Sequence, residues 1–421
     1  MKLKSLLVFL TAIILCVLCM QCAKKEKGDR QVLRYSAPGF VLYNTIRENA
    51  GKEFEKKHPG VKTIYEPISG QGFFEKLLTQ LASGTEPDIF FMRDFELPNF
   101  VQKGSIMELN GFIENDPGFD LKDYHKILID SYTVNNKIYG LPGSFTSGVI
   151  FYNKDILARA GMKPMNDLSW DKLLKAGQQL TIRSEMKTVK QFGIVLEYYD
   201  WITFILQNEG SFFSPDKKKC ILNSPQAAEA VDFLKSLIKT HHITPSMVDL
   251  EQAEAYSLFM LNRAALFTGG RWYTTIFKEI KNFQWGIMPF FYNKKKSVRL
   301  DSHSWVISQK AKDPKLAWEF LKFLTSRDSN WKMVEVGDSV PIHRSNLRKF
   351  IKMNPENKVF VDSLDYAYTV DKIMTPYVTW REMQTILREE FDKFILDQQN
   401  SVNTLMAIDS RINEKIKANM K

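Results

Sequence analysis

Acidic and aromatic side chains gather in one short stretch of the sequence, Glu197 to Trp201, which reads EYYDW. Its two acids, Glu197 and Asp200, could serve as the paired carboxyl groups of a glycoside hydrolase. Acids beside the rings of Tyr199 and Trp201 could equally bind a sugar without reacting with it, because sugars offer hydroxyls and flat C–H faces. Spacing alone does not separate catalysis from binding, and Trp201 could also be the first core residue of the next helix.

The segment GGRW, Gly269 to Trp272, holds the tryptophan that we consider most available for binding. Two glycines let the backbone bend, so Arg271 and Trp272 should project from a loop tip or from the start of a helix. A single tryptophan is more often a core residue, but the preceding glycines make simple burial less convincing. We therefore expect Trp272 and Arg271 to be available for contact with a ligand.

Polar side chains also follow two of the predicted strands. Arg93 and Asp94 come directly after the strand-like DIFFM, where they could hold hydroxyl groups bidentately or form an ordinary surface ion pair. Gln71 stands between two glycines after the strand VKTIYEPI, where it could contact a hydroxyl or belong to a plain turn. Loops that follow strands at the edge of an open α/β sheet are a common place for ligands.

Motifs of familiar enzyme classes are missing from the sequence. It contains no Gly-x-Ser-x-Gly, no His-Glu-x-x-His and no Gly-x-x-x-x-Gly-Lys. The stretch GQGFFE begins like a dinucleotide fingerprint but lacks the third glycine. The pair His241–His242 lies at a predicted helix end, where the helix dipole favours cations, so it needs no metal. We expect neither a cofactor nor a bound metal.

Three of the four cysteines, Cys16, Cys19 and Cys22, end an apolar run that begins MKLKSLLVFLTAIIL. Their spacing resembles part of an iron–sulfur ligand set, but the remaining cysteine, Cys220, is remote and alone. Two lysines followed by an apolar core are the order of a secretory signal. The rival interpretation is a transmembrane anchor, because the run approaches the length that spans a bilayer. The polar tether AKKEKGDRQ that follows favours a signal.

The same stretch resembles a bacterial lipoprotein signal, which implies cleavage and lipidation at a cysteine. Cys22 fits best by position, although Gln21 departs from the small residue expected before it, so Cys19 remains an alternative. Residues 1–22 would then be the signal up to the lipidated cysteine, and residues 23–30 a polar tether. We expect a protein outside the cytoplasm, held at the membrane by its lipid.

Composition limits the remaining possibilities. The net charge of +10 comes from lysine runs scattered along the chain and not from one basic stripe interleaved with aromatics, so we expect no nucleic-acid partner. Roughly 400 residues after the signal exceed one ordinary core and predict two domains. A mature chain with one cysteine has no internal disulfide and must depend on its core. We expect a monomer.

The apolar pattern predicts alternating strands and helices. Strand, helix, strand, helix and strand follow one another over residues 31–92, as in a mostly parallel sheet covered by helices. The Gly-rich stretch YGLPGSFTSGVIFYNKD could pass from one lobe to another. Ser224–Pro225 and Asp313–Pro314 each place an N-cap before proline and predict helix starts. The chain from Trp380 onward is predicted to be helical.

Several segments, in this order, resemble the extracellular solute-binding proteins of ATP-driven (ABC) importers, family 1, and especially the group that captures sugars. The segments are FEKKHPGVKTIYEPISG, LLTQLASGTEPDIFFMRD, NNKIYGLPGSFTSGVIFYNKDILARAGM with SWDKLLKAGQQLT, FMLNRAALFTGGRW, WGIMPF, and KAKDPKLAWEFLKFLTSRDSNWKMVEVGDSVP. The similarity covers essentially all of the chain after the tether. No single segment would be specific, but their common order is.

The resemblance implies an α/β fold of the two-lobed periplasmic-binding-protein kind (type II-like), with a hinge of crossing segments and a ligand cleft between the lobes. Residues 31–143 with 285–338 would form the N-terminal lobe, and residues 144–284 with 339–421 the C-terminal lobe. A ligand that touches both lobes would stabilise the closed state by its higher affinity for it. The permease of the importer would then recognise that state.

The resemblance also adds candidate ligand contacts. Asp94 aligns with an acidic ligand contact of sugar binders in this family. His303 lies where the family has a Gly-rich segment, and we expect it to face the cleft in spite of this departure. Trp380 is a further stacking candidate, and Thr146 is a polar candidate in the crossing segment.

Two functions from different classes follow from the sequence. The first is a lipid-anchored receptor, without catalytic activity, that delivers a carbohydrate to an importer. The second is a glycoside-degrading enzyme of the cell envelope on a two-domain fold. A binding protein of the same fold for another solute is a third possibility, although aromatic-rich loops argue against a small inorganic ion.

Overall fold

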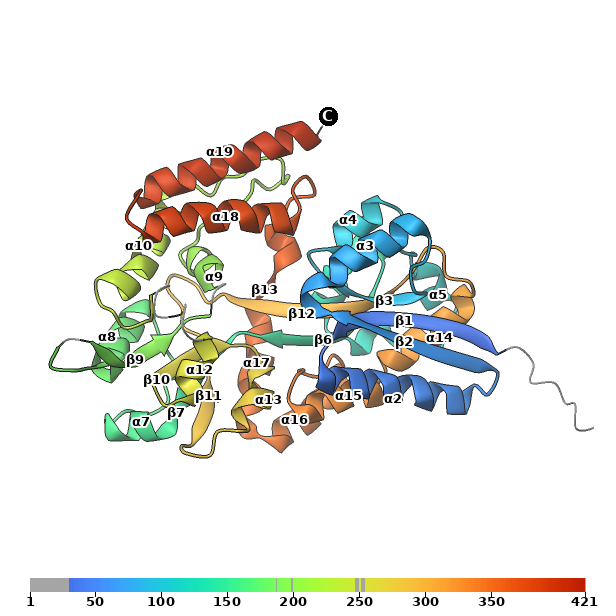
Figure 1. Ribbon diagram of the computed structural model, residues 1–421, viewed down its shortest axis with the longest axis horizontal. Coiled ribbons are helices and arrows are strands. Elements are labelled where there is room, and N and C mark those ends of the chain that lie inside the picture. Colours follow the sequence, from blue (N-terminus) through green and yellow to red (C-terminus); the bar gives the residue numbers. More distant parts are fainter. Residues whose placement is uncertain (1–29, 187, 198–199, 247–249, 251–253, 421) are drawn as a thin grey trace, which may run out of the picture.

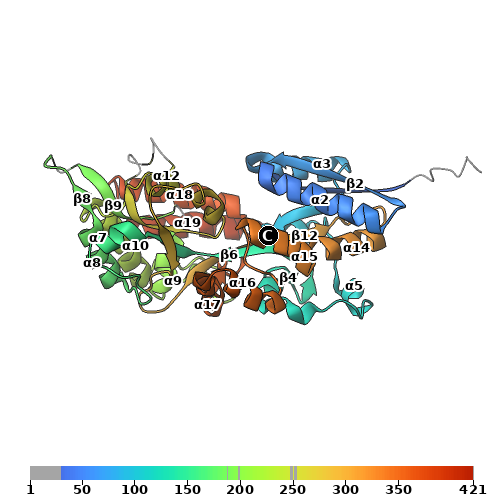
Figure 2. The ribbon, with the colours of Figure 1, turned by 90° about the horizontal axis from the view of Figure 1, so that it is seen from below.

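Two lobes lie side by side in the computed structural model, which describes residues 30–186, 188–197, 200–246, 250 and 254–420 (Figure 1). Each lobe contains its own β-sheet with helices packed on it. Seen from below, the chain passes between the lobes through strands near the middle of the molecule (Figure 2). In the part of the chain that the structure describes, no helix has the length and apolar character needed to cross a membrane.

The sheet of the first lobe is built on three parallel strands near the start of the chain. Strand β1 pairs in parallel with β2 on one side and with β3 on the other, which confirms the predicted alternation of strands and helices. Strand β12 runs antiparallel to β3, and β6 pairs with β12. The six strands are β1 (Gln31–Gly39), β2 (Val61–Ser69), β3 (Ile89–Arg93), β6 (Leu141–Ser147), β12 (Val298–Ile307) and β13 (Ala367–Thr369).

Helices of the first lobe cover this sheet and share an aromatic core. Tyr35, Phe54 and Phe320 meet there, with the Phe320 ring 4.9 Å from that of Tyr35 and 4.8 Å from that of Phe54. Asp313 accepts hydrogen bonds from the first amides of α14, so the predicted helix start before Pro314 is confirmed. The helices are α2 (Val41–Lys57), α3 (Phe73–Ser83), α4 (Leu97–Gln102), α5 (Asn110–Glu114), α6 (Lys126–Ser131), α14 (Pro314–Leu324) and α15 (Arg327–Val336). A short ribbon joins β4 (Thr133–Val134) to β5 (Lys137–Ile138).

The sheet of the second lobe has five strands in the order β11-β7-β10-β9-β8. Its two central neighbours β9 and β10 are parallel, whereas β7 runs antiparallel to β10 and to β11. The strands are β7 (Val149–Asn153), β8 (Ile182–Arg183), β9 (Val189–Val195), β10 (Ala264–Gly269) and β11 (Trp285–Met288).

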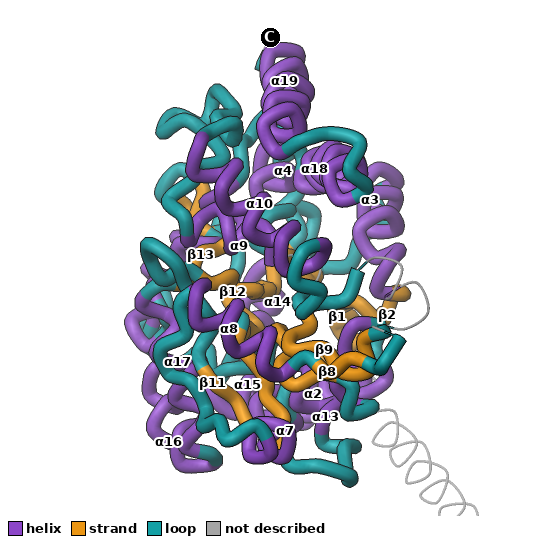
Figure 3. The backbone as a smooth tube through the Cα atoms, turned by 90° about the vertical axis from the view of Figure 1, so that its left-hand side faces the viewer, coloured by secondary structure: helices purple, strands orange, loops and turns teal. Residues whose placement is uncertain are grey.

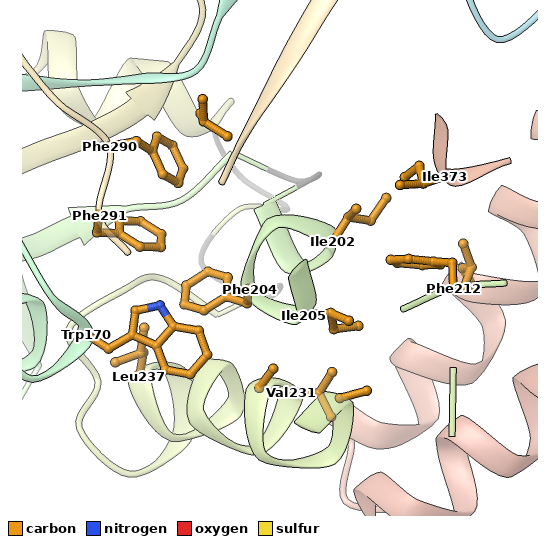
Figure 4. Close-up of a cluster of buried hydrophobic side chains, with 14 of the residues drawn as sticks. Trp170, Ile202, Phe204, Ile205, Phe212, Val231, Leu237, Phe290, Phe291 and Ile373 are labelled. Atoms are coloured by element: carbon orange, nitrogen blue, oxygen red, sulfur yellow. The ribbon is translucent and has the colours of Figure 1, made fainter. Parts of the chain in front are cut away.

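The second lobe owes its core to aromatic side chains from several helices. Trp170 of α8 stacks on Phe233 of α10 with ring centroids 4.5 Å apart. Phe204 of α9 packs beside both rings, and Figure 4 shows it next to Trp170. Ser224 caps α10, as its sequence predicted. The helices are α7 (Lys154–Arg159), α8 (Trp170–Leu180), α9 (Asp200–Gln207), α10 (Pro225–Lys239), α12 (Ala255–Met260), α13 (Tyr273–Phe277), α18 (Trp380–Ile395) and α19 (Ser401–Asn419). Helices α18 and α19 lie together at one end of the molecule (Figure 3).

The lobes are joined by β6, by β12 and by the segment 337–343. Val340 in this segment bonds through its amide to the carbonyl of Phe145 in β6. Beyond it, α16 (Leu347–Met353) and α17 (Lys358–Asp362) lie near the middle of the molecule, below β6 in Figure 1. Gly148, between β6 and β7, lies so close to β12 that a β-carbon there would come within 2.9 Å of Val298. The chain can therefore pass from one sheet to the next only with a small residue at this point.

Two strands depart from the expected division of the chain. Strand β11 pairs with β7, so the chain at residue 285 still belongs to the second sheet and not yet to the first. Strand β13 pairs with β12 in the first sheet, although the region after residue 338 was expected in the second lobe. Both strands occupy sheet edges, where an added strand satisfies backbone groups that would otherwise lack partners.

Candidate ligand-binding site

The carboxyl ends of β1, β2 and β3 meet at one edge of the first sheet, because these strands are parallel. Phe40 follows β1, Gly70 follows β2, and Asp94 follows β3. Phe40 is 56% exposed, although it is a large aromatic residue. Its ring lies against Gly70, where a β-carbon would come within 3.0 Å of it, and meets Tyr43 edge to face at 5.7 Å. This edge thus presents an aromatic ring that is exposed and yet held in place.

The register of the crossing strands connects this edge to the second lobe. His303 of β12 pairs with Arg93 of β3 on one side and with Ser144 of β6 on the other. Two residues along β6, Thr146 accepts a hydrogen bond of 2.8 Å from the backbone amide of Arg271. Since adjacent strands lie about 4.8 Å apart, Arg93, His303 and Thr146 form a short path between the two sheet edges.

Asp94 is buried directly after β3, next to Arg93. Only 2% of its surface is exposed, and its carboxylate accepts a hydrogen bond of 3.2 Å from the amide of Val370. Burial, together with the nearby carboxylates of Asp371 and Asp301, raises the pKa of the Asp94 carboxyl to about 7. The structure therefore does not contain the ordinary surface ion pair between Asp94 and Arg93 that the sequence also allowed. Arg93 is half-buried, with its guanidinium 6.0 Å from the ring of Phe91 and 5.7 Å from that of Phe95.

His303 is half-buried in the path between the sheets. Its ring packs on Phe91 at 4.6 Å, and burial lowers the pKa of its imidazole well below the usual value. The neighbouring charges of Arg47 and Arg93 act in the same direction. His303 is thus a neutral group that can donate one hydrogen bond and accept one.

Trp380 belongs to the core and not to an open stacking surface. It is 5% exposed, begins α18, and packs against Phe95 of the first lobe with ring centroids 5.4 Å apart. The next residue, Arg381, forms an ion pair with Glu75 of α3. We expected a ligand to stack on Trp380, but in this structure Phe95 of the opposite lobe packs on its ring.

In the second lobe, Glu197 and Trp272 lie at one sheet edge because β9 and β10 are parallel. The Glu197 amide bonds to Thr268 at 2.8 Å, and a Glu197 carboxylate oxygen accepts a hydrogen bond of 3.1 Å from the Tyr273 hydroxyl. Trp272 is half-buried, with its ring 5.7 Å from that of Tyr273. A β-carbon on Gly270 would clash with the indole, which explains the glycine before Arg271.

Arg271 points away from any open surface, contrary to expectation. It is 5% exposed, and its guanidinium donates to the carbonyl of Ser339 at 2.9 Å, to Asn357 at 3.0 Å and to the carbonyl of Val334 at 3.2 Å. The ring of Phe350 lies 4.6 Å from it. Burial lowers the pKa of Arg271 to about 10, so the group stays charged at neutral pH. The expectation of a ligand contact is therefore wrong for this side chain, which holds protein segments together.

Thr146 and Trp201 are also engaged within the protein. The Thr146 hydroxyl is buried between the Arg271 amide and the carbonyl of Ser147. Trp201 packs on Phe391 of α18 at 4.4 Å and on Phe212 at 6.0 Å. The core alternative for Trp201 is thus the one that the structure favours.

Some of the candidates fall outside what the structure describes. Tyr199 and the lipidation candidates Cys22 and Cys19 are outside the described residues, and only the backbone of Gln71 and Asp200 is described. Gln71 lies in a single helical turn, Gly70–Gly72, and Asp200 begins α9. Their ligand contacts stay predictions.

The sequence did not indicate the exposed Phe40 or the polar residues Tyr43, Arg47 and Asp338 that lie near it. Tyr43 donates a hydrogen bond to Asp338, and Arg47 lies 5.7 Å from the Tyr43 ring while it donates to the carbonyl of Pro38 at 2.7 Å. The available signal was the apolar run Phe40-Val41-Leu42 directly after a predicted strand, where loops of an open α/β sheet commonly meet ligands; all three side chains are exposed in the structure.

A separate hollow of about 490 Å³ lies in the first lobe between the segment 116–124 and the junction of α14 with α15. In its lining, Asp116 pairs with Lys322 and Asp120 with Arg327. No candidate ligand contact that the structure describes lines this hollow.

Residues 39–331 match the family described as bacterial extracellular solute-binding protein. The chain belongs to this family. A relative from Bacillus subtilis (strain 168), named arabinooligosaccharide-binding protein, is 28% identical over 79% of this chain and 79% of its own length. A relative from Streptococcus pneumoniae serotype 4, named maltooligosaccharide ABC transporter solute-binding lipoprotein, is 23% identical over 80% of each chain.

Among solved structures, an ABC substrate-binding protein from Listeria monocytogenes in complex with cycloalternan is similar to the chain described here. It superimposes with a TM-score of 0.82 over 92% of this chain and 100% of its own, at 24% identity. The likeness at this identity concerns the fold, and it confirms the expected two-lobed α/β architecture.

Replacement of Arg271 by alanine should destabilise the protein even without a ligand. It would remove the donor to the Ser339 carbonyl and to the Asn357 side-chain oxygen, at a cost of roughly 1–3 kcal/mol for each, so we expect the free energy of unfolding to fall by about 3 kcal/mol. Urea unfolding followed by tryptophan fluorescence measures this. The exposed Arg263→Ala is the matched control and should change stability little. An unchanged midpoint for Arg271→Ala would contradict the structural role.

Asp94→Asn should flatten the dependence of stability on pH. The folded protein keeps the Asp94 proton up to about pH 7, whereas the unfolded chain loses it near pH 4. The folded state binds more protons between these values, so the free energy of unfolding of the wild type should fall as pH rises from about 4 to 7, by at most about 4 kcal/mol. The variant should lack this decline and should be the more stable protein above pH 7.

Urea midpoints at several pH values between 4 and 8 test this expectation. The exposed Asp365→Asn is the control and should keep the wild-type slope. Identical slopes for Asp94→Asn and wild type would show that Asp94 does not titrate in this window.

Proposed function

We propose that this protein is the receptor of an ABC importer, and that it captures a carbohydrate between its lobes and delivers it to the permease. The observation that carries the proposal is the path of Arg93, His303 and Thr146 along the crossing strands, which joins an aromatic edge of each sheet. A ligand on this path would reach Phe40 on one side and Trp272 on the other. The family and the printed names of its relatives support a sugar as that ligand.

The groups on the two edges suit a sugar better than an ion. Aromatic rings such as Phe40 and Trp272 offer faces for the C–H side of a pyranose, and the half-buried Glu197 and His303 offer hydrogen bonds to hydroxyls. The imidazole of His303 is neutral, and the Asp94 carboxyl holds or shares a proton. The site can therefore donate hydrogen bonds as well as accept them. A mono- or oligosaccharide meets these requirements without a net charge on the ligand.

Closure of the lobes would be the functional step. Each lobe has a core of its own, so we propose that the two sheets with their helices move as bodies about the crossing segments. A ligand that contacts both edges shifts the equilibrium toward the closed form by the difference between its affinities for the two states. The permease would recognise that form, and the sugar would leave it chemically unchanged.

The protein is proposed to work outside the cytoplasm, held at the membrane by lipid on Cys22. The lipoprotein-like order of residues 1–30 and the lipoprotein named among the relatives support the anchor. One acyl chain binds a membrane only marginally, whereas several together hold a soluble domain firmly. We propose a monomer that needs no nucleic acid, cofactor or metal.

A panel of oligosaccharides tests the proposal. Maltotriose and arabinotriose, with longer and shorter members of both series, would be added to the purified protein while its melting temperature and the sugar products are followed. We expect a saturable rise in melting temperature for at least one sugar and no products. Turnover of a sugar would instead support the glycoside-degrading enzyme, and no response to any sugar would favour another solute.

Two variants locate the site. Trp272→Ala should abolish the sugar-induced rise and leave the melting temperature of the free protein nearly unchanged. Phe40→Ala should weaken binding about five- to tenfold, since an aromatic stacking contact contributes about 1 kcal/mol or more. Leu396→Ala, which removes an equally exposed apolar side chain at the end of α18, is the control and should bind normally. Collapse of free Trp272→Ala would place this residue in the core instead.

Cys22→Ala tests the anchor. Expressed in a bacterium that processes lipoproteins, the wild type should sediment with membranes and carry acyl chains detectable by mass spectrometry. The variant should lose both properties. If Cys19→Ala loses them and Cys22→Ala does not, the lipid is on Cys19.

A further inference from the structure

Helix α13 of the second lobe meets the carboxyl end of α15 of the first lobe. Three side chains in and beside α13 donate hydrogen bonds across this contact. Thr274 donates to the carbonyl of Gly337 at 2.5 Å, Lys278 to that of Val336 at 2.7 Å, and Arg271 to those of Val334 and Ser339. We call Arg271, Thr274 and Lys278 the α13 clamp.

The chemistry of a helix end explains why these groups gather here. The last carbonyls of a helix have no partner within it and carry the negative end of the helix dipole. α15 turns at Gly337, whose φ of 99° is left-handed, and the amides of Gly337 and Asp338 bond back to Val334 and Met333. Lys278 of the clamp meets the last carbonyl of α15, that of Val336, and Arg271 adds a second donor to the Val334 carbonyl. The clamp thus brings two positive charges to this helix end. A β-carbon on Gly337 would clash with the Thr274 hydroxyl, so glycine also permits the close approach.

The two helices are rooted in different lobes. Lys332 of α15 pairs with Glu53 of α2 at 2.7 Å, and Asp338 just beyond α15 accepts a hydrogen bond from Tyr43 of α2. α13 instead packs its Phe277 on Phe151 of the second sheet, with ring centroids 5.1 Å apart. The clamp therefore links the lobes by side chains, in addition to the strands that cross between them.

We propose that the α13 clamp is the pivot of the molecule: it limits the angle between the lobes in the free protein and positions Trp272 relative to the first lobe. Trp272 directly follows Arg271 in the chain, so its indole can shift little against α15 while the clamp holds. Closure would then rotate the lobes about the clamp, and a sugar stacked on Trp272 would meet the first lobe at a set distance. The positioning of Trp272 against a sugar rests on the proposed function, whereas the limit on the angle between the lobes does not.

The double variant Thr274→Val/Lys278→Met tests the clamp while it keeps the buried Arg271. Nitroxide labels would be attached through p-acetylphenylalanine in place of Lys52 of α2 and Lys175 of α8, both exposed, which leaves the cysteines untouched. Pulsed electron paramagnetic resonance of the full chain without sugar gives the distribution of distances between the lobes. We expect the distribution in the double variant to be at least twice as wide as in the wild type.

Two controls separate a pivot from a general loss of stability. Lys281→Met removes an exposed lysine that donates to the carbonyl of Lys278, within its own lobe, and it should leave the distribution unchanged. Thr274→Ser/Lys278→Arg keeps both donors and should restore a narrow distribution. A wild-type distribution in a folded Thr274→Val/Lys278→Met protein would overturn the proposal, and so would equal broadening in Lys281→Met.

Titration with maltotriose and arabinotriose examines the positioning of Trp272. We expect the double variant to bind the active sugar about tenfold more weakly, with a smaller change in tryptophan emission, at a temperature where both proteins are folded. An unchanged dissociation constant would refute the positioning role. If neither sugar binds the wild type but the distance distribution of the double variant broadens, the pivot stands and the proposed function fails. If a sugar binds the wild type and the distribution does not broaden, the proposed function stands and the pivot fails.

Discussion

The pairing of β12 with strands on both of its sides is the constraint on which the rest of the structure depends. Residues His303 to Ile307 pair with β3, and residues Leu300 to Trp305 pair with β6 on the opposite side. Side chains alternate along a strand, so a slip of one residue would exchange His303 for a buried serine and separate it from Arg93. The register of β12 thus fixes the position of the carboxyl end of β3, in the first sheet, relative to β6, which leads into the second lobe.

Charge is buried where the lobes meet, in contrast to the aromatic interior of each lobe. Asp94 and Arg271 are both almost fully buried, and each bonds to backbone of a segment that crosses or approaches the other lobe. A buried ion costs several kcal/mol unless polar partners surround it, so these contacts are directional and tolerate little rearrangement. Apolar packing holds each lobe as a body and also connects the lobes, as between Phe95 and Trp380, while the hydrogen bonds add directional contacts between them.

Local signals in the chain were sufficient for most elements and for the general position of the site. The N-caps at Ser224 and Asp313 and the alternation over residues 31–92 depend on neighbours within a few positions, and they were predicted correctly. Short edge strands such as β11 and β13 carry no such signal, because their pairing depends on which distant strand offers a free edge. Aromatic residues were the hardest to place: Trp201 and Trp380 pack inward, whereas Phe40 is exposed.

The sequence by itself determined the family, the alternation of strands and helices, and the loops at strand ends where polar and aromatic residues collect, since all of these follow from local pattern and order along the chain. Only the tertiary structure decided the direction of individual side chains. Arg271 and Trp272 are adjacent and follow the same two glycines, yet one is buried against the end of α15 and the other stays half-exposed. The difference arises because the carbonyls of Val334 and Ser339 and the side-chain oxygen of Asn357, all distant in the sequence, meet at the guanidinium, and no local pattern encodes that approach.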